Sequence, residues 1–178
     1  KKQVQEEYLL VYGYNVIFSW EELQELSKID IDSARSRLMD ILSDYQGYRQ
    51  MTLILVFDAY KVQGGQEKIE KYHNIYVVYT KEAETADQYI ERTVHRIGRQ
   101  AQVTVATSDA MEQIIIMGAG ASRMSSRELQ EEIANTRQEL RKESLDHPSP
   151  GGKRYLFQEL PEELAELMEA VRMGRKEL

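Results

Sequence analysis

The chain of 178 residues has the length of one domain and is long enough to bury a core. Its formal net charge is −7, so its overall field does not attract nucleic acid, and phosphate contacts would need a local basic surface or a metal ion. The absence of cysteine excludes disulfides, thiolate catalysis and cysteine zinc sites, and no apolar run reaches the roughly 18 residues of a membrane span.

Four apolar runs predict β-strands, and amphipathic segments between them predict helices. We expect strands at residues 8–12, 51–57, 74–80 and 102–107, with a shorter β-rich run, IIIMG, at 114–118. The runs are nearly continuous, which is typical of strands buried on both faces. We expect helices at WEELQELSK (20–28), DSARSRLMDILSDYQGY (32–48) and ETADQYIERTVHRIG (84–98). The alternation predicts a three-layer α/β fold, with a mostly parallel sheet and helices on both faces.

The composition changes after Met124, where a charged segment follows the α/β pattern. Ser125 or Ser126, with a glutamate close behind, marks the start of a helix. DHPSPGG at 146–152 predicts a break, and LPEELAELMEAVRMG at 160–174 predicts a last amphipathic helix. We therefore divide the chain into an α/β core, 1–124, and a C-terminal helical appendage, 125–178, packed against the core or projecting from it.

Carboxylates follow three of the four predicted strands. In a parallel sheet, ligands collect at the carboxyl ends of the strands. Asp58 follows the second strand, Glu84 and Asp87 follow the third, and Asp109 follows the fourth. Each could simply cap a helix or hold a turn, but together they would repel one another unless a cation lies between them. Oxygen ligands suit Mg²⁺ or Mn²⁺, which activates water in phosphodiester hydrolysis.

Several segments together resemble the YacP-like NYN domains, which have the PIN-like nuclease fold. They are GYN at 13–15, LVFDAYKV at 55–62, VVYTKEAETADQYIE at 77–91, VATSDAMEQ at 105–113 and MGAGASRMSSREL at 117–129. The resemblance runs over about residues 8–145 and implies a cytoplasmic, bacterial, metal-dependent endoribonuclease; some members act on mRNA at the ribosome. The segments also resemble the C-terminal extension of some ribosomal-protection GTPases, which would make this chain part of a larger GTPase chain.

The resemblance implies a set of site residues and one departure from the family pattern. It assigns metal or catalytic roles to Asp58, Glu84, Asp87 and Asp109, with Asn15 supporting the site from the first loop. The family pattern Asp-Gly-Tyr-Asn begins with an expected metal ligand, but this chain has Tyr12 there. A phenol, with a pKa of about 10, is a poor Mg²⁺ ligand and is bulkier than a carboxylate.

Tyr12 leaves more than one function open. The first is a metal-dependent endoribonuclease with weakened activity, and the second is a catalytically silent RNA- or ribosome-binding module of the same fold. A third is a receiver-like phosphotransfer domain, since Asp58 follows a central strand, although Tyr12 and Gly13 supply no acidic pair.

Basic residues near the predicted site are candidates for RNA binding. Lys61, Lys68 and Lys71 belong to a glycine-containing segment, 61–73, that we expect to form a flexible loop over the site. Arg123 is expected near a strand end, where it could meet phosphate or bond a carboxylate of the site. Phe18 and Trp20 follow the first turn in an apolar context and are predicted to lie in the core rather than to stack on bases.

Overall fold

The computed structural model describes residues 5–58 and 67–146, in which strands and helices alternate. The strands are β1 (Glu7–Tyr12), β2 (Thr52–Phe57), β3 (Lys68–Tyr72), β4 (Ile75–Tyr79), β5 (Gln102–Ala106) and β6 (Ser122–Met124). The helices are α1 (Gly13–Ser19), α2 (Glu21–Ile29), α3 (Ile31–Arg49), α4 (Ala86–Ile97), α5 (Ala110–Gly118) and α6 (Ser126–Asp146), with the 3₁₀ turn η2 (Gly98–Gln100) after α4. The four predicted strands and the three predicted helices are confirmed by β1, β2, β4, β5, α2, α3 and α4.

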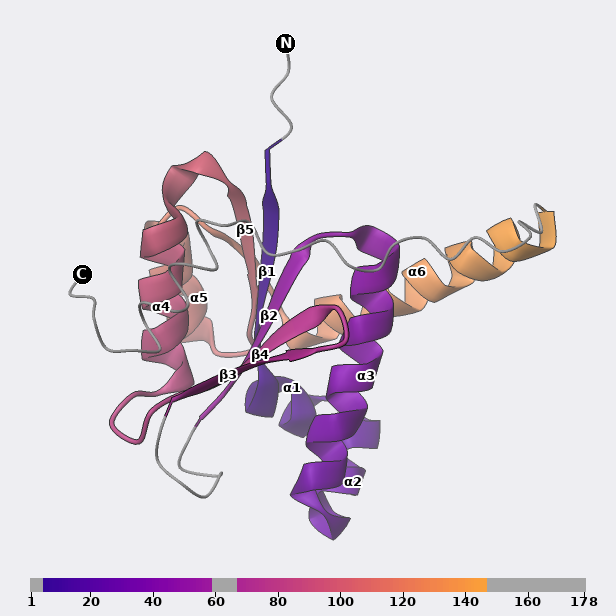
Figure 1. The fold of residues 1–178 in the computed structure, drawn as a ribbon, viewed down its shortest axis with the longest axis horizontal. Helices are drawn as coiled ribbons and strands as arrows, with labels where there is room; N and C mark the ends of the chain where they lie inside the picture. The colour runs from indigo at the N-terminus through magenta and orange to yellow at the C-terminus, as the bar shows by residue number, and fades with distance from the viewer. Residues whose placement is uncertain (1–4, 59–66, 147–178) are drawn as a thin grey trace.

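The strands form one sheet between two groups of helices (Figure 1). Its six strands have the order β3-β4-β2-β1-β5-β6. Among the described strands, only β3 and β4 form an antiparallel pair, and the other neighbours are parallel. The predicted three-layer α/β fold with a mostly parallel sheet is therefore confirmed.

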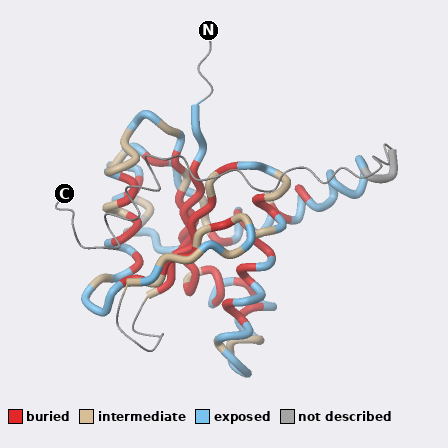
Figure 2. The backbone as a smooth tube through the Cα atoms, in the orientation of Figure 1, coloured by how far each residue is buried: buried red, intermediate tan, exposed pale blue. Residues whose placement is uncertain are grey.

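The sheet separates two apolar clusters, and Figure 2 shows its central strands as buried. Alternate residues of β1 point to opposite faces, so Leu9 and Val11 belong to one cluster and Leu10 and Tyr12 to the other. Helices α1, α2, α3 and the start of α6 cover the first face, and α4 and α5 cover the second. Because both faces are covered, β1 is buried from Tyr8 to its end, which explains its continuous apolar sequence.

The first turns of α6 pack on the core. Ser125 Oγ accepts a hydrogen bond from the backbone N–H of Glu128 at 3.0 Å, and Glu128 Oε1 accepts one from the N–H of Ser125 at 3.3 Å. This reciprocal capping box is the predicted start of the helix. Leu129 and Ile133 are buried in the cluster that contains α1 and α3, and Trp20 Nε1 donates to the carbonyl of Ser126 at 2.7 Å.

Figure 1 shows the later turns of α6 projecting from the body of the molecule. The proposed division of the chain at residue 124 stays a prediction, and the helix predicted at 160–174 lies outside the described residues. In the part of the chain that the structure describes, no helix is long and apolar enough to span a membrane.

Two local predictions are wrong. The run at 114–118 lies in α5 and not in a strand, since a short apolar run does not distinguish the two by periodicity. The backbone N–H of Gln113 donates to the carbonyl of Asp109 at 3.0 Å at the start of this helix, and Ile116 is buried against the sheet. Part of the expected loop at 61–73 is the edge strand β3, which pairs with β4. Its sequence, KIEKY, is too rich in charged residues to be recognised as a strand from its pattern. Residues 59–66 lie outside the described residues.

Candidate active site

Three aspartates lie at the carboxyl edge of the sheet. Asp58 directly follows β2, Asp87 lies in the first turn of α4, and Asp109 directly precedes α5. Burial raises the pKa of Asp87, and the negative charges of Asp58 and Asp109 raise it further. The three carboxylates are therefore close enough to interact electrostatically, although they come from segments about 30 and 20 residues apart in the chain.

Asp58 joins the end of β2 to the start of α4. Its Oδ1 accepts a hydrogen bond from the backbone N–H of Ala86, the first residue of the helix, at 2.6 Å. Thr85 caps the same helix through a reciprocal pair with Gln88. A carboxylate at a helix N-terminus is stabilised by the unpaired N–H groups there. Asp58 was considered as a residue that holds a turn, and one of its oxygens instead binds the N-terminus of α4.

Tyr12 lies among these carboxylates. Its side chain is buried, and its hydroxyl forms a hydrogen bond with the carboxylate of Asp87, which lowers the pKa of that group and opposes the effect of burial. The hydroxyl can stabilise a neighbouring carboxylate, but a neutral phenol cannot bind a divalent cation as a carboxylate does. Tyr12 thus occupies the position of the family's expected metal ligand and bonds to another candidate ligand.

Asn15 holds the loop that carries Asp109. Its Oδ1 accepts a hydrogen bond from the backbone N–H of Ser108 at 2.5 Å and from Ser126 Oγ at 3.2 Å. These bonds connect α1 to the end of β5 and to the start of α6. The site was expected to be supported from a first loop, but Gly13 to Ser19 form the short helix α1. Asn15 therefore positions the backbone next to Asp109 from a helix.

Glu84 forms an ion pair with the side chain of Arg92. Its Oε1 lies 2.8 Å from Arg92 Nη2, and both side chains are largely buried. Arg92 Nη2 also lies 3.9 Å from Oε1 of Glu67, whose side chain is buried. The structure therefore pairs Glu84, which precedes α4, with Arg92 of that helix, whereas the charges of Asp58 and Asp109 act on Asp87. A metal-binding role for Glu84 stays a prediction.

The three aspartates have the oxygen donors that a divalent cation prefers, but their side chains do not lie close enough together to coordinate one ion as they stand. Carboxylate oxygens are the donors that Mg²⁺ and Mn²⁺ prefer, and the like charges around Asp87 would be relieved by a cation. Within residues 5–58 and 67–146, however, no three acidic or histidine side chains lie close enough to hold one metal ion as they stand. A cation would therefore have to compete with the Tyr12 hydroxyl for Asp87.

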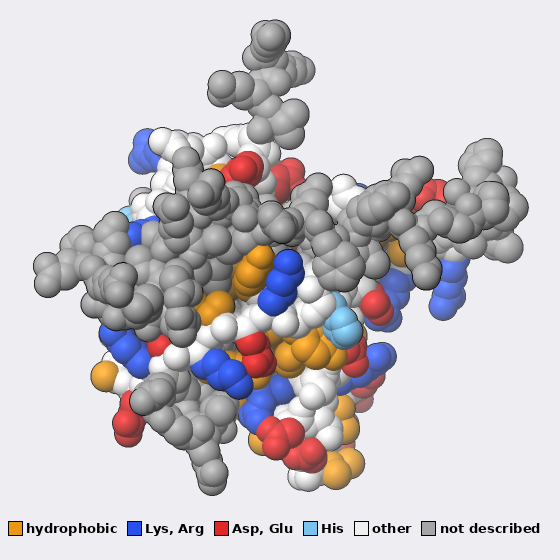
Figure 3. Space-filling model, viewed as in Figure 1, with side chains coloured by type: hydrophobic (Ala, Val, Ile, Leu, Met, Phe, Trp, Pro, Cys, Tyr) orange, Lys and Arg blue, Asp and Glu red, His pale blue; other side chains and the backbone are white. Residues whose placement is uncertain are grey.

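The predicted RNA-binding residues are dispersed. Lys68 pairs with Tyr79, the last residue of β4, and thus lies near the carboxyl edge. Its Nζ lies 3.2 Å from Glu70 Oε2. Lys71 lies three residues further along β3, about 10 Å from that position along the strand. Figure 3 shows Lys and Arg side chains interspersed with Asp and Glu side chains on the visible face, and not gathered into one basic surface.

Arg123 lies in β6 and belongs to a polar network. Its Nη1 donates to Oε1 of Gln113 at 3.1 Å, and Gln113 Nε2 donates to the carbonyl of Thr107 at 2.7 Å. This network reaches the end of β5, two residues before Asp109. Lys61 lies outside the described residues.

An aromatic row at the same edge was not predicted from the sequence. The ring centroids of Tyr14 and Phe57 are 5.0 Å apart, and those of Phe57 and Tyr79 are 5.7 Å apart. Phe18 stacks on Tyr14 from the next turn of α1. Trp20 is buried as predicted, but Phe18 is 45% exposed, so its predicted place in the core is wrong. Phe18 lies one turn after Tyr14, near the end of α1, and its ring is exposed there.

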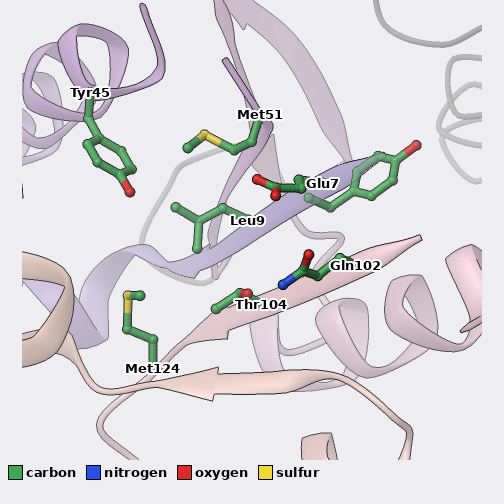
Figure 4. Close-up of a pocket in the computed structure, with 8 residues that line it drawn as sticks. Glu7, Leu9, Tyr45, Met51, Gln102, Thr104 and Met124 are labelled. Carbon is green, nitrogen blue, oxygen red and sulfur yellow. The ribbon is translucent and has the colours of Figure 1, made fainter. Parts of the chain in front are cut away.

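A cavity on the α3 side of the sheet lies apart from the aspartates. It has a volume of about 100 Å³ and is lined by residues that include Leu9, Tyr45, Met51 and Thr104. Figure 4 shows Tyr45 of α3 and Met51 on one side of it, facing Leu9 and Thr104 of the sheet. It is smaller than the 300 Å³ or so of an ordinary ligand site, so it does not suit a nucleotide.

The sequence model of the YacP-like NYN domain matches residues 9–173. The chain belongs to the YacP-like NYN domain family. YacP of Bacillus subtilis (strain 168) is 41% identical over 155 residues, which cover 85% of this chain and 91% of YacP.

Two crystal structures of YacP-like NYN proteins share the fold. Rae1 (YacP) from Bacillus subtilis superposes with a TM-score of 0.67 at 38% identity, covering 94% of this chain and 95% of the other. A tryptophan-to-leucine mutant of Rae1 gives a TM-score of 0.68 at 31% identity, covering 94% of this chain and 96% of the other. Membership of this family replaces the receiver-like interpretation.

Proposed function

We propose that this YacP-like NYN domain is a metal-dependent endoribonuclease whose acidic site consists of Asp58, Asp87 and Asp109. The observation that supports the proposal is the position of Asp87 at the carboxyl edge of a mostly parallel sheet, where the charges of Asp58 and Asp109 act on its carboxylate. The negative charges of Asp58 and Asp109 raise the pKa of Asp87, and a divalent cation among the three carboxylates would offset this repulsion.

The reaction is phosphodiester hydrolysis. Mg²⁺ or Mn²⁺ would lower the pKa of a bound water and offset charge on the phosphoryl oxygens. Asp87, Asp109 and the Asp58 oxygen that does not accept from Ala86 would supply the ligand atoms. Asn15 keeps the loop of Asp109 in place through its bond to Ser108. The hydroxyl of Tyr12 holds Asp87, so that cation binding and activity are weaker than with an aspartate at position 12.

The substrate that we propose is mRNA, bound at the ribosome in the cytoplasm, as the family resemblance implies. Of the predicted RNA-binding residues, Lys68 pairs with the last residue of β4 and Arg123 lies in β6, so they are the first candidates for phosphate contacts. Lys61 and Lys71 stay predictions, as does a link to a larger GTPase chain. With a net charge of −7, the chain depends on such local contacts to bind RNA.

A second candidate is a catalytically silent RNA- or ribosome-binding module. It is favoured by one observation, the buried Tyr12 side chain in hydrogen-bond contact with Asp87. In this case the fold would keep its surfaces for binding, while the cation site would no longer form.

Incubation of the purified protein with end-labelled single-stranded RNA tests the proposal. We expect cleavage in Mn²⁺ or Mg²⁺ that stops when the cation is chelated and that Asp87→Asn abolishes. Asp44→Asn, which removes the same charge from α3 near the opposite edge, is the matched control and should cut at the wild-type rate. Equal cleavage by the wild type and Asp87→Asn would overturn the proposal. RNA binding without cleavage in either protein would support the silent module.

A further inference from the structure

Phe18 is an exposed aromatic side chain on a fixed support. Among the large apolar residues exposed in the described part of the chain, it is the aromatic one. Its ring lies 6.2 Å from that of Tyr14 with an angle of only 20° between their planes. Tyr14 itself is buried and packs on Phe57, and its hydroxyl accepts a hydrogen bond from Arg35 Nη1 at 2.9 Å. The ring on which Phe18 stacks is therefore held on two sides by Phe57 and Arg35.

The supporting rings are continuous with the acidic site. Phe57 directly precedes Asp58, and Tyr14 follows Tyr12 by two residues. Phe18 lies six residues after Tyr12 along α1, which corresponds to about 9 Å. Figure 1 shows α1 at the edge where β1 and β2 end. The exposed ring thus lies on the helix that begins directly after Tyr12, the residue whose hydroxyl bonds to Asp87.

Among the described residues, Phe18 is the one large apolar side chain of α1 that is exposed. Its neighbours Ser19, Glu21 and Glu22 are polar and exposed. A stable protein interface buries more than about 1,000 Å², with an apolar centre. A single exposed ring can instead stack on a ligand much smaller than a protein, such as a nucleobase, which is flat and aromatic. Stacking on a base does not depend on charge, which matters at an edge where three carboxylates repel phosphates.

We propose that Phe18 stacks on a base of single-stranded RNA and thereby holds the substrate next to the acidic site. This inference rests on the proposed function for the identity of the substrate, but it concerns binding and not cleavage. Because every base has an aromatic face, the contact tolerates different sequences. Lys68, whose side chain is 66% exposed and lies over the Tyr79 ring at the far end of the aromatic row, is placed to meet the phosphate backbone of the same strand.

The test is a binding titration in the presence of a chelator, so that no RNA is cut. Fluorescence anisotropy compares a labelled single-stranded RNA with an abasic oligomer of the same length and charge. For Phe18→Ala we expect binding of the RNA to weaken about tenfold, with unchanged binding of the abasic oligomer. Phe18→Trp should restore binding, and Ile29→Ala, which removes an exposed apolar side chain from α2, should have no effect. Thermal unfolding shows that each variant is folded.

Three results would overturn the inference: equal RNA binding by Phe18→Ala and the wild type, an equal loss of RNA and abasic binding, or a change in self-association alone. The cleavage assay separates this inference from the proposed function. If Phe18→Ala binds RNA weakly and no protein cuts RNA, base stacking stands and the nuclease proposal fails. If the wild type cuts RNA and Phe18→Ala cuts it with unchanged KM, the nuclease stands and the stacking role fails.

Discussion

The two faces of the sheet carry different chemistry at the same edge. On the α4 side lie Asp58, Asp87 and the hydroxyl of Tyr12, and on the α1 side lie the rings of Phe57 and Tyr14. Because consecutive strand residues point to opposite faces, two adjacent positions in the sequence, Phe57 and Asp58, serve the two sides. The comparison shows how a sheet edge separates a charged half, suited to phosphodiester chemistry, from an aromatic half, suited to holding a base.

The largest effect is expected on the charged side. Asp109→Asn should lower the rate of RNA cleavage about a hundredfold, because it removes a ligand charge while an asparagine can still cap α5. Single-turnover cleavage in Mn²⁺ measures the rate. Ser108→Ala, at the neighbouring exposed position, is the control and should keep the wild-type rate. An unchanged rate in Asp109→Asn would remove Asp109 from the site.

On the aromatic side, we expect substitutions to change the stability of the fold rather than the rate of cleavage. A Cβ at Gly13 would lie 2.2 Å from Cε1 of Phe57, so Gly13→Ala must displace the aromatic row. We expect it to lower the free energy of unfolding by about 1–3 kcal/mol, as overpacking does. Urea unfolding provides the measurement. Gly118→Ala is the matched control, since a Cβ there meets no atom within 4 Å, and it should be neutral or stabilising. Equal free energies of unfolding for the two variants would show that the aromatic rings can move aside without loss of stability.

Substitution of Tyr12 distinguishes the two candidate functions, the endoribonuclease and the catalytically silent module. Tyr12→Asp should raise the cleavage rate roughly tenfold, because it adds a ligand and releases Asp87. Tyr12→Phe separates these effects, since it releases Asp87 without adding a carboxylate. The same single-turnover assay in Mn²⁺ applies. A wild type that already cuts as fast as Tyr12→Asp would show that the tyrosine does not weaken the site.

The smallest expected effect is on thermal stability, which the ionised Asp87 side chain lowers. Burial and the neighbouring carboxylates raise its pKa above the usual 3.8, so its ionised form is less stable in the fold than in the unfolded chain. In the presence of a chelator, Asp87→Asn should raise the Tm at neutral pH. This advantage should shrink as the pH falls through the raised pKa toward 3.8, because the folded wild type then takes up a proton before the unfolded chain does. Asp44→Asn should show no such trend.

Much of the charged side could be predicted from the sequence. Apolar runs mark where strands end, and Asp58, Asp87 and Asp109 follow those ends in an order that brings them to one edge. The pairing of Glu84 could not be predicted in the same way. Its partner Arg92 is eight residues away, and their contact depends on how the loop before α4 meets the helix.

The aromatic side was missed for a local reason. A helix of seven residues has too little periodicity to recognise, so Gly13 to Asn15 indicated a turn and Phe18 was assigned to the core on its hydrophobicity alone. Tyr14 and Phe18 are four residues apart, which is the spacing of neighbours on a helix. That spacing was the available signal, and it became meaningful only once α1 was seen to be a helix.

The central claim is that Asp58, Asp87 and Asp109 together bind a divalent cation. Crystals of the wild type and of Tyr12→Asp, soaked in Mn²⁺ and measured at a wavelength where manganese scatters anomalously, test it directly. The account predicts an anomalous peak among the three carboxylates, weaker in the wild type than in Tyr12→Asp. Absence of a peak from both crystals would contradict it.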